Sequence, residues 1–538
     1  MKNSTAIPPN IILILADDMG FADIGCFGSE IETPNLDRLG MEGVRCTSMY
    51  NGARCCPTRA SLLTGLYPHQ AGVGFMIGDL GRSAYQGYLR DDCVTIAELL
   101  QTNGYRTLMA GKWHVGGDYE PRKADSWRPG DLSHPTPNQR GFDRFYGMLD
   151  GAGSFFHPHY VMEDGKRVET DPENYYLTDA ITEKGIEMIE GAVEEERPFF
   201  LYLAHTAPHW PLHAHPEEIA KYEGRYRQGW DAVRTARHEE MKGLKLVDSR
   251  WDISPRDPDA LPWEDVAEQD WYDLCMAVYA AQIDRMDQGI GKVLDKLDEL
   301  GVADNTIVLF LSDNGGCAEL LEEDGWARFY GGTLPSGGEI QLGNRPDLRP
   351  GTADTFMSYG VAWSNVSNAP FRFHKRWVHE GGISTPLLVR WPNKIAGGRI
   401  DHTPCHVIDL MATFLAACGV DYPKEFNGRS IQPLAGENLL PLWEGGEWKR
   451  ERPLFWEHQG NCAVRFDNWK LVREFGGAWE LYDMNTDRTE LHNLVAKNRP
   501  MAEQLTRLYS EWAGQIGVVE WELLLPIFAG LYAGGELT

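Results

Sequence analysis

Acidic and amide side chains directly follow two short apolar runs of this sequence. Asp17 and Asp18 come after the first run, and Asp313 and Asn314 come after the second. In open α/β sheets ligands bind beyond the carboxyl ends of the strands, so we expect these side chains to meet there. Three converging carboxylates repel one another unless a cation lies between them, and oxygen ligands favour Ca²⁺ or Mg²⁺ over zinc. The pattern therefore predicts a site for a hard divalent cation, although either pair alone is also typical of a helix cap or a turn.

A pair of cysteines lies within Asn51–Gly65, NGARCCPTRASLLTG, which has the pattern of a loop that enters a helix. Pro57 suits the first helical position, and the last glycine can end the helix. Cys55 is then expected at the helix N-terminus, where unpaired N–H groups favour anions, and Arg59 adds a planar cation near the same face. From the residues alone we predict an anion site, but a vicinal disulfide between Cys55 and Cys56, or a buried pair of thiols, also fits.

Short aliphatic runs alternate with amphipathic stretches over most of the chain, and they must position these residues. Apolar residues between Ile283 and Leu300 recur at helical spacing, and Gly301 stands where a C-cap belongs. Strands that alternate with such helices predict an α/β domain around a mainly parallel sheet flanked by helices. The runs predicted to be buried strands are Ile11–Ala16, Tyr105–Ala110, Phe199–Ala204 and Thr306–Leu311.

The pattern changes near residue 436. Short runs at 462–466, 469–473 and 479–482 predict strands joined by tight turns, and residues 501–515 predict a helix. We therefore expect a large α/β domain over residues 1–435 and a small α+β domain, with a short antiparallel sheet and a helix, over residues 436–538.

Two further segments have their own patterns. Residues 318–367 are rich in Gly, Pro and Asp and have little periodicity, which predicts a long functional loop or an excursion of the surface. The apolar tail Leu523–Tyr532 is interrupted by Pro526, and we interpret it as a packing contact or a contact between copies in a homo-oligomer.

The charge balance excludes some classes of partner. The chain of 538 residues has 79 Asp and Glu against 51 Lys and Arg, a net charge of −28. This excess repels phosphate backbones and anionic membranes, so we expect neither nucleic acid nor membrane as a partner. The start of the chain lacks the apolar core of a signal peptide, and no apolar run reaches the roughly 20 residues of a membrane span. We expect a cytoplasmic protein, or a periplasmic one if a leader has been removed.

The ten cysteines are too few for a disulfide scaffold and include no Cys-x-x-Cys pair, so a structural zinc site is not indicated. We expect most of them to be small buried side chains.

Several segments together resemble one enzyme family. Residues 55–65, CCPTRASLLTG, match the Cys-x-Pro-Thr-Arg-x-x-x-Leu-Thr-Gly signature of type I sulfatases, which belong to the alkaline phosphatase superfamily. The resemblance extends over roughly residues 9–515 and is nearest to bacterial arylsulfatases. It implies an alkaline-phosphatase-like fold and hydrolysis of a sulfate monoester, an aryl sulfate or a sulfated saccharide, to the alcohol plus inorganic sulfate. The other matching segments are Asp17-Asp18, Thr33–Asp37, Gly111–His114, Ala207–Leu212, Ser312–Gly315 and His379–Gly382.

The resemblance also implies a modified residue and a metal ion. In this family the first cysteine of the signature is oxidised to Cα-formylglycine by a formylglycine-generating enzyme, a partner during maturation. Position 55 would then present a gem-diol, one hydroxyl of which attacks sulfur. An unmodified cysteine has only one such group on its carbon, so it could not expel sulfate and return to its starting state. The ion implied is Ca²⁺, with Mg²⁺ as the alternative. The residues that resemble its ligands are Asp17, Asp18, Asp313, Asn314 and the modified Cys55.

The family's catalytic roles fall on five further positions. Arg59 resembles the residue that holds the formylglycine, and Lys112 and Lys375 resemble sulfate-binding cations. His114 resembles the base that acts on the formylglycine hydroxyl, and His209 resembles the group that protonates the leaving oxygen.

Alternatives remain for some assignments. Lys375 lies in Phe371–Arg376, which offers neighbouring cations, and His205 is a weaker competitor of His209. A phosphonate monoester or phosphodiester hydrolase on the same scaffold is a second candidate function, although those enzymes tend to carry Gly before the Pro of the signature. A non-catalytic anion-binding relative is a third.

The sequence leaves the identity of the alcohol open. We expect residues 116–164 and 318–367 to line the mouth of the site, and their aromatic side chains suit an aryl group or the face of a sugar. The aromatic and histidine residues concerned are Trp127, Phe155, Phe156, His157, His159, Tyr160 and Tyr330.

Overall fold

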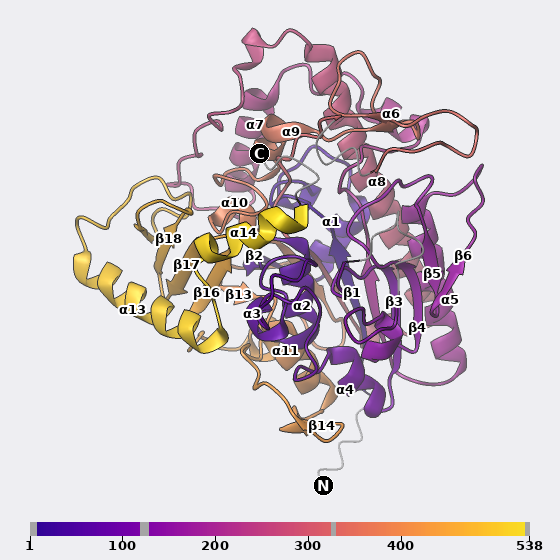
Figure 1. Cartoon of the computed structure of the whole chain (residues 1–538), viewed down its shortest axis with the longest axis vertical. Coiled ribbons are helices and arrows are strands. Elements are labelled where there is room, and N and C mark those ends of the chain that lie inside the picture. Colours follow the sequence, from indigo (N-terminus) through magenta and orange to yellow (C-terminus); the bar gives the residue numbers. More distant parts are fainter. Residues whose placement is uncertain (1–7, 119–128, 324–329, 533–538) are drawn as a thin grey trace.

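The computed structural model of the protein describes residues 8–118, 129–323 and 330–532. A sheet of eleven strands forms its centre (Figure 1). The strands are β1 (Asn10–Ala16), β2 (Val44–Tyr50), β3 (Arg106–Lys112), β4 (Arg144–Met148), β5 (Val161–Glu163), β6 (Lys166–Val168), β7 (Phe199–Ala204), β8 (Thr306–Ser312), β11 (Ser384–Arg390), β12 (Arg399–Asp401) and β13 (Cys405–His406). Their order is β12-β2-β11-β8-β1-β7-β3-β4-β5-β6, with β13 paired to β2. The five central strands β8, β1, β7, β3 and β4 run parallel, which confirms the predicted fold class.

Helices cover both faces of the sheet, and this explains why its central strands read as continuous apolar runs. Alternate residues of β1 enter two different core clusters, Ile12 and Ile14 on one face and Ile11 and Leu13 on the other. The first cluster includes residues of α1 (Pro34–Glu42), α5 (Leu177–Glu194) and α8 (Gln269–Glu299). The second includes residues of α2 (Cys55–Thr64), α4 (Ile96–Thr102) and α11 (Asp409–Cys418). The remaining α-helices that the structure describes before residue 450 are α3 (Pro68–Ala71), α6 (Pro216–Tyr222), α7 (Trp230–Gly243), α9 (Gly360–Ser367), α10 (Glu380–Ile383) and α12 (Leu440–Trp443).

The predicted helix before β8 is confirmed, but it is longer than its apolar pattern. It is α8, which begins at Gln269 and ends at Glu299. Leu300 is its C-cap and Gly301 follows, so the prediction placed the cap one residue late.

A second, smaller unit lies beside the large sheet, orange and yellow in Figure 1. Its four antiparallel strands are β16 (Leu454–His458), β17 (Asn461–Phe466), β18 (Trp469–Arg473) and β19 (Glu480–Asp483), and α13 (Arg499–Ile516) packs on them. Three of the strands and the helix are as predicted within two residues. Strand β16 was not predicted, because its apolar residues stand next to one another and give no period of two.

Two predictions for irregular segments need correction. Residues 318–367 are not a continuous loop, because they contain the short strands β9 (Gln341–Leu342) and β10 (Thr355–Phe356) and end in the helix α9. All residues of α9 but one are buried, and α9 contacts α7. A helix that is buried on all sides has no polar face, so the sequence shows no helical periodicity there.

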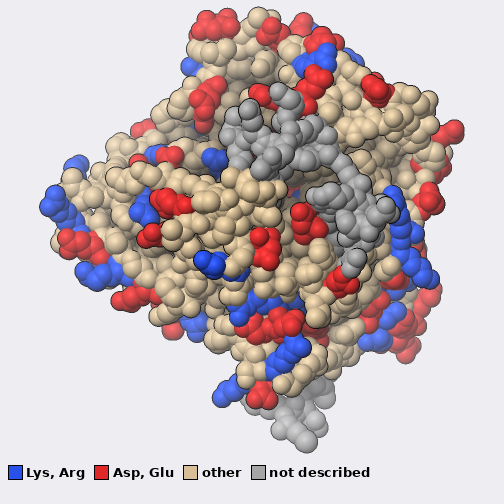
Figure 2. Space-filling model, in the orientation of Figure 1, with Lys and Arg blue, Asp and Glu red and all other residues tan. Residues whose placement is uncertain are grey.

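The apolar tail is one helix, α14 (Trp521–Tyr532), with Pro526 inside it, rather than an interrupted segment. Trp521 and Leu524 are buried with Phe75 and Tyr85, which accounts for the predicted packing contact. The side of α14 that points away from these residues is exposed. In Figure 2 the surface at the position of α14 carries few charged side chains, whereas acidic and basic residues are interspersed over the rest of the view. Within the described residues, no single helix is long and apolar enough to span a membrane, and one bent pair, Arg499–Ile516 with Trp521–Leu531, passes by length and composition only.

Candidate active site

The predicted residues meet at the carboxyl-end edge of the parallel strands. Ala16 pairs with Ser312, so the residues that follow them, Asp17 and Asp313, leave β1 and β8 side by side. Lys112 is the last residue of β3. The loop after β7 adds His209. One ring nitrogen of His209 and one carboxylate oxygen each of Asp17 and Asp18 lie within 4.8 Å of one another and could bind one metal ion.

Four of the five predicted metal ligands, Asp17, Asp18, Asp313 and Asn314, form a buried group of oxygens. The backbone N–H of Asp18 donates to Asp313 Oδ1 (3.2 Å), and Asn314 Nδ2 donates to Asp18 Oδ1 (2.7 Å). Among the described residues, Asp17 Oδ1 and Asn314 Oδ1 are buried without a hydrogen-bond partner. Unpartnered buried oxygens cost free energy, and oxygens are the ligands of a hard cation, so the residues present fit a divalent metal ion.

Three buried cations face the three carboxylates of this group. The closest contacts are Arg59 Nη2–Asp313 Oδ2 (2.8 Å), Lys112 Nζ–Asp17 Oδ2 (2.6 Å) and Lys375 Nζ–Asp18 Oδ2 (2.7 Å). Their formal charges cancel, so a bound divalent ion would give this buried site a net positive charge inside a protein of net charge −28. Short-range attraction to such a site outweighs repulsion by distant, screened surface charges, so an anionic substrate can bind.

The acidic residues respond unequally to burial. Burial raises the pKa of Asp17, but Lys112, His209 and Arg59 more than offset this and lower it to about 2. Burial and the nearby Asp17 carboxylate raise the pKa of Asp313 well above its usual value. Repulsion between two neighbouring buried carboxylates, Asp17 and Asp313, is the electrostatic situation that a divalent ion relieves.

Cys55 is the first residue of α2, as predicted for an anion site at a helix N-terminus. Pro57 is the third helical residue rather than the first, which the helix tolerates because the first four N–H groups have no partner within it. All ten cysteines are free, so Cys55 and Cys56 form no disulfide, and nine of the ten are buried. A hydrogen bond with Cys56 and the charges of Lys112 and His114 outweigh burial and lower the pKa of Cys55 well below its usual value, so position 55 favours negative charge.

The other signature residues hold α2 against the strand ends. Thr58 Oγ1 donates to the carbonyl oxygen of Asp313 (2.6 Å) and accepts from the N–H of Gly52 (2.8 Å). Arg59 donates through Nε (3.0 Å) and Nη2 to Asp313 Oδ2, and through Nη1 to the carbonyl of Lys112 (2.8 Å). Arg59 thus ties the helix that carries Cys55 to both β8 and β3.

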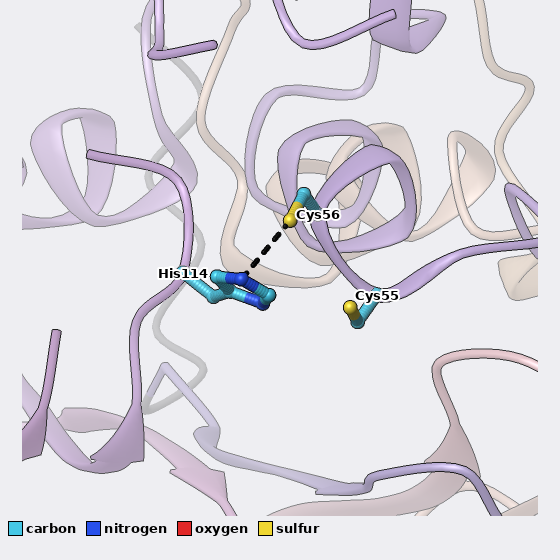
Figure 3. Close-up of side chains that lie close together, drawn as sticks. All are labelled: Cys55, Cys56 and His114. Carbon is cyan, nitrogen blue, oxygen red and sulfur yellow. Dashed lines mark hydrogen bonds between the residues drawn. The ribbon is translucent and has the colours of Figure 1, made fainter. Parts of the chain in front are cut away.

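His114 faces the start of α2 (Figure 3). Its Nε2 lies 3.3 Å from Cys56 Sγ, and its Nδ1 has no partner among the described residues. Burial lowers its pKa to about 4, so the ring is neutral near pH 7 and able to accept a proton.

His209 and Lys375 lie together beside the carboxylate of Asp18. His209 Nδ1 lies 2.7 Å from the carbonyl of Trp210, which requires the proton on Nδ1, and its Nε2 lies 3.3 Å from Lys375 Nζ and 3.4 Å from Asp18 Oδ2. The competitor His205 is buried at the end of β7, and both of its ring nitrogens are unpartnered among the described residues. The structure therefore brings His209, and not His205, into the group of potential metal ligands.

Two residues beside the site were not predicted. Glu319 accepts from Trp210 Nε1 (2.9 Å) and pairs with Arg54 Nη1 (3.0 Å). Arg54 precedes Cys55, so its position next to the signature was a usable signal. Glu319 lies in a segment without periodicity, and nothing in the sequence indicates its contacts.

The aromatic residues expected at the mouth have different environments. Phe155 is buried and Phe156 is half-buried, packed near Tyr176 and His213 rather than near Cys55. Tyr330 stacks on Phe356 and contacts Trp210, which places it near His209. Trp127 lies outside the described residues.

Comparison with known proteins gives one consistent result. The family model described as Sulfatase matches residues 9–420, and the model described as N-sulphoglucosamine sulphohydrolase, C-terminal, matches residues 371–513. An arylsulfatase of Klebsiella aerogenes is 34% identical, with 81% of this chain and 92% of the relative aligned. An uncharacterized sulfatase of Schizosaccharomyces pombe is 32% identical over 96% of both chains. The crystal structure of Ps i-CgsB superposes with a TM-score of 0.66 at 27% identity and covers 94% of this chain and 93% of its own.

Proposed function

The chain belongs to the sulfatase family and hydrolyses sulfate esters, and we propose that its nucleophile is a formylglycine made from Cys55. The observation that carries this proposal is the position of Cys55, at the N-terminus of α2 and among cations that favour negative charge there. The hydrated aldehyde would supply a hydroxyl that attacks sulfur and a second hydroxyl from which sulfate can be expelled.

We propose Ca²⁺ as the ion held by Asp17, Asp18, Asp313, Asn314 and the modified residue 55, since all protein ligands are oxygens and Mg²⁺ prefers to keep several waters. When bound, the ion would stabilise negative charge on the oxygens of the sulfuryl group. Lys112 and Lys375 each have an ammonium group that can donate to a sulfuryl oxygen as well as to its carboxylate, and Arg59 holds Asp313 in place.

The two histidines have separate roles in this proposal. His114, neutral and facing the start of α2, accepts the proton of the formylglycine hydroxyl when sulfate is expelled. The leaving oxygen is protonated on the side of His209. His209 Nδ1 keeps its proton in the bond to the Trp210 carbonyl, so the proton given to the leaving oxygen would be carried on Nε2, which lies beside Asp18 and Lys375. A positioned general acid typically contributes about 10²–10⁴-fold to the rate.

Replacing Cys55 tests the proposal directly. We expect Cys55→Ala to abolish turnover of 4-nitrophenyl sulfate while its unfolding midpoint stays close to that of the parent. Cys275→Ala is the matched control, because Cys275 is equally buried but lies in the core of α8, and it should retain turnover. Mass spectrometry of the peptide holding position 55 should detect the aldehyde in active protein. Full activity of Cys55→Ala, or a thiol at position 55 in active protein, would show the proposal to be wrong.

The alternative phosphonate activity can be measured in the same assay. A solved phosphonate monoester hydrolase of Agrobacterium radiobacter has the same fold, at 19% identity and a TM-score of 0.56, which carries no information on substrate. We expect an aryl sulfate to be turned over faster than the matching aryl phosphonate. A dominant phosphonate rate would contradict the assignment.

A further inference from the structure

Arg376 is an exposed cation held in an unusual backbone conformation. Its backbone φ is +90°, a value that residues other than glycine rarely adopt. Its backbone N–H donates to the carbonyl of Ala53 (2.7 Å). Its guanidinium lies over the ring of Trp377 (4.5 Å to the centroid). Within the described chain, this guanidinium has no hydrogen bond or ion pair. Because residue 53 is two positions before Cys55, the backbone bond fixes Arg376 beside the start of α2.

Arg54 stands next to it, on the side of the site from which the alcohol leaves. Its guanidinium pairs with Glu319 Oε1 through Nη1 (3.0 Å) and contacts Met76 Sδ through Nε (3.3 Å), while Nη2 has no partner among the described residues. Glu319 in turn accepts from Trp210, the neighbour of the proposed leaving-group residue His209. A substituent on the alcohol would therefore meet this pair.

His458 supplies a second, independent observation. It ends β16, which is brought against the loop before α2 by the bond from Trp456 Nε1 to the carbonyl of Asn51 (2.8 Å). Its ring is 1% exposed, and both ring nitrogens lack a partner among the described residues. Burial and the positive charges of Arg54 and Arg376 hold the pKa of His458 well below its usual value, so the ring is neutral and lies close enough to these two arginines to feel their charge. A buried polar group without a partner costs free energy that a bound ligand recovers.

The charges around the start of α2 do not balance. Lys375 is matched by Asp18, and Arg54 by Glu319, but Arg376 has no carboxylate partner in the described chain. An uncompensated guanidinium beside an active site is unexpected in a protein of net charge −28, and a guanidinium matches the planar or tetrahedral oxygens of an anion.

We propose that Arg376, with Arg54 and His458, forms a subsite for a second anionic group, a carboxylate or a second sulfate, on the alcohol that carries the scissile sulfate. The inference rests on the proposed sulfatase activity and narrows its substrate class to esters with two anionic groups, such as an acidic or multiply sulfated saccharide. The ring of Trp377 packs against one face of the Arg376 guanidinium. Because Arg376 is exposed, the N–H groups at the edge of this guanidinium are free to bind the ligand.

The test compares two substrates of nearly the same shape, of which one carries an additional negative charge. These are 4-nitrophenyl sulfate carrying a ring carboxylate and the same ester carrying a ring carboxamide, and the readout is the ratio of their kcat/KM values. We expect the parent protein to favour the carboxylate about 10- to 100-fold, the range for a charge-assisted hydrogen bond. Arg376→Gln should bring this ratio close to one. Arg429→Gln is the matched control and should leave the ratio unchanged. Arg429 is an exposed arginine of the hairpin formed by β14 (Glu425–Phe426) and β15 (Arg429–Ser430), and it pairs with Asp91.

Arg376→Gly guards against misfolding, because glycine adopts a φ of +90° without strain and removes the same guanidinium. It should lose the preference as Arg376→Gln does. A parent protein without preference for the carboxylate, or an Arg376→Gly variant that keeps it, would overturn the subsite. Failure of the parent protein to hydrolyse either ester would instead contradict the proposed function, so the two failures are distinguishable.

Discussion

At the scale of single residues, the proposed metal site depends on oxygens that accept no hydrogen bond. Asp17 Oδ1 and Asn314 Oδ1 are both buried without a hydrogen-bond partner among the described residues, and Arg59 Nη2 lies 3.6 Å from Asp17 Oδ1. Asn314 is the more informative of the two, because replacing it removes a neutral ligand and leaves the charge of the site unchanged.

We predict that Ca²⁺ raises the unfolding temperature of the parent protein, since a ligand that binds only the folded state adds about 2.7 kcal/mol at 100 times its Kd. Asn314→Ala should weaken Ca²⁺ binding in calorimetry and shrink this thermal shift, whereas the control Asn103→Ala, at the end of α4, should retain both. Calorimetry with Mg²⁺ should show weaker binding than with Ca²⁺. Equal Ca²⁺ affinity of Asn314→Ala and the parent would remove Asn314 from the ligand set.

At the scale of elements, the position of Lys112 depends on how closely β3 packs against β7. Gly111 precedes Lys112 with a φ of +117°, and a Cβ added there would lie 1.8 Å from the carbonyl oxygen of Ala204. Gly104, at the start of the same strand region, also has a positive φ (+90°), but an added Cβ would meet nothing within 4 Å.

Alanine at Gly104 would introduce backbone strain alone, whereas alanine at Gly111 would introduce both backbone strain and steric overlap. We expect Gly104→Ala to lower the free energy of unfolding by about 1–2 kcal/mol, the cost of a left-handed conformation. Gly111→Ala should lower it by more and should also reduce kcat/KM, because β3 must move away from β7 and carry Lys112 with it. Urea unfolding and sulfatase assays of both variants measure these effects, and equal losses of stability would show that the overlap relaxes without consequence.

The same scale shows where prediction from the sequence ends. The strands β1 and β8 were predictable because they are buried on both faces and therefore apolar at every position. That Ala16 pairs with Ser312, 296 positions away, was not, because pairing order is decided by packing and not by local pattern. The site residues were predictable where a signature fixes them, as at Cys55 and Arg59. Glu319 was not, because its role arises only from contacts with Arg54 and Trp210.

At the scale of the whole molecule, the small C-terminal unit braces the segment that carries Lys375 and Arg376. Glu380, at the start of α10, pairs with Lys470 of β18 (2.9 Å) and with Arg488 (2.8 Å), and all three are buried. Burial raises the pKa of Glu380, but Lys470 and Arg488 more than offset this and lower it to about 2, from an unperturbed value of 4.5. The network thus joins the two sheets through charges that stabilise one another.

We predict that Glu380→Gln lowers the free energy of unfolding by about 3–5 kcal/mol near pH 7, the usual cost of leaving a buried charge without its partner. Glu447→Gln, an exposed control between α12 and β16, should have little effect. Because the folded pKa of Glu380 lies below its unfolded value, its stabilisation is complete above about pH 4.5 and is lost as the pH falls towards 2. The difference between Glu380→Gln and the parent in urea unfolding should therefore be large at pH 7 and shrink at pH 3. A difference that is absent at pH 7 would mean that the ion pairs of Glu380 do not help to hold the two sheets together. The segment carrying Lys375 and Arg376 would then not depend on this network.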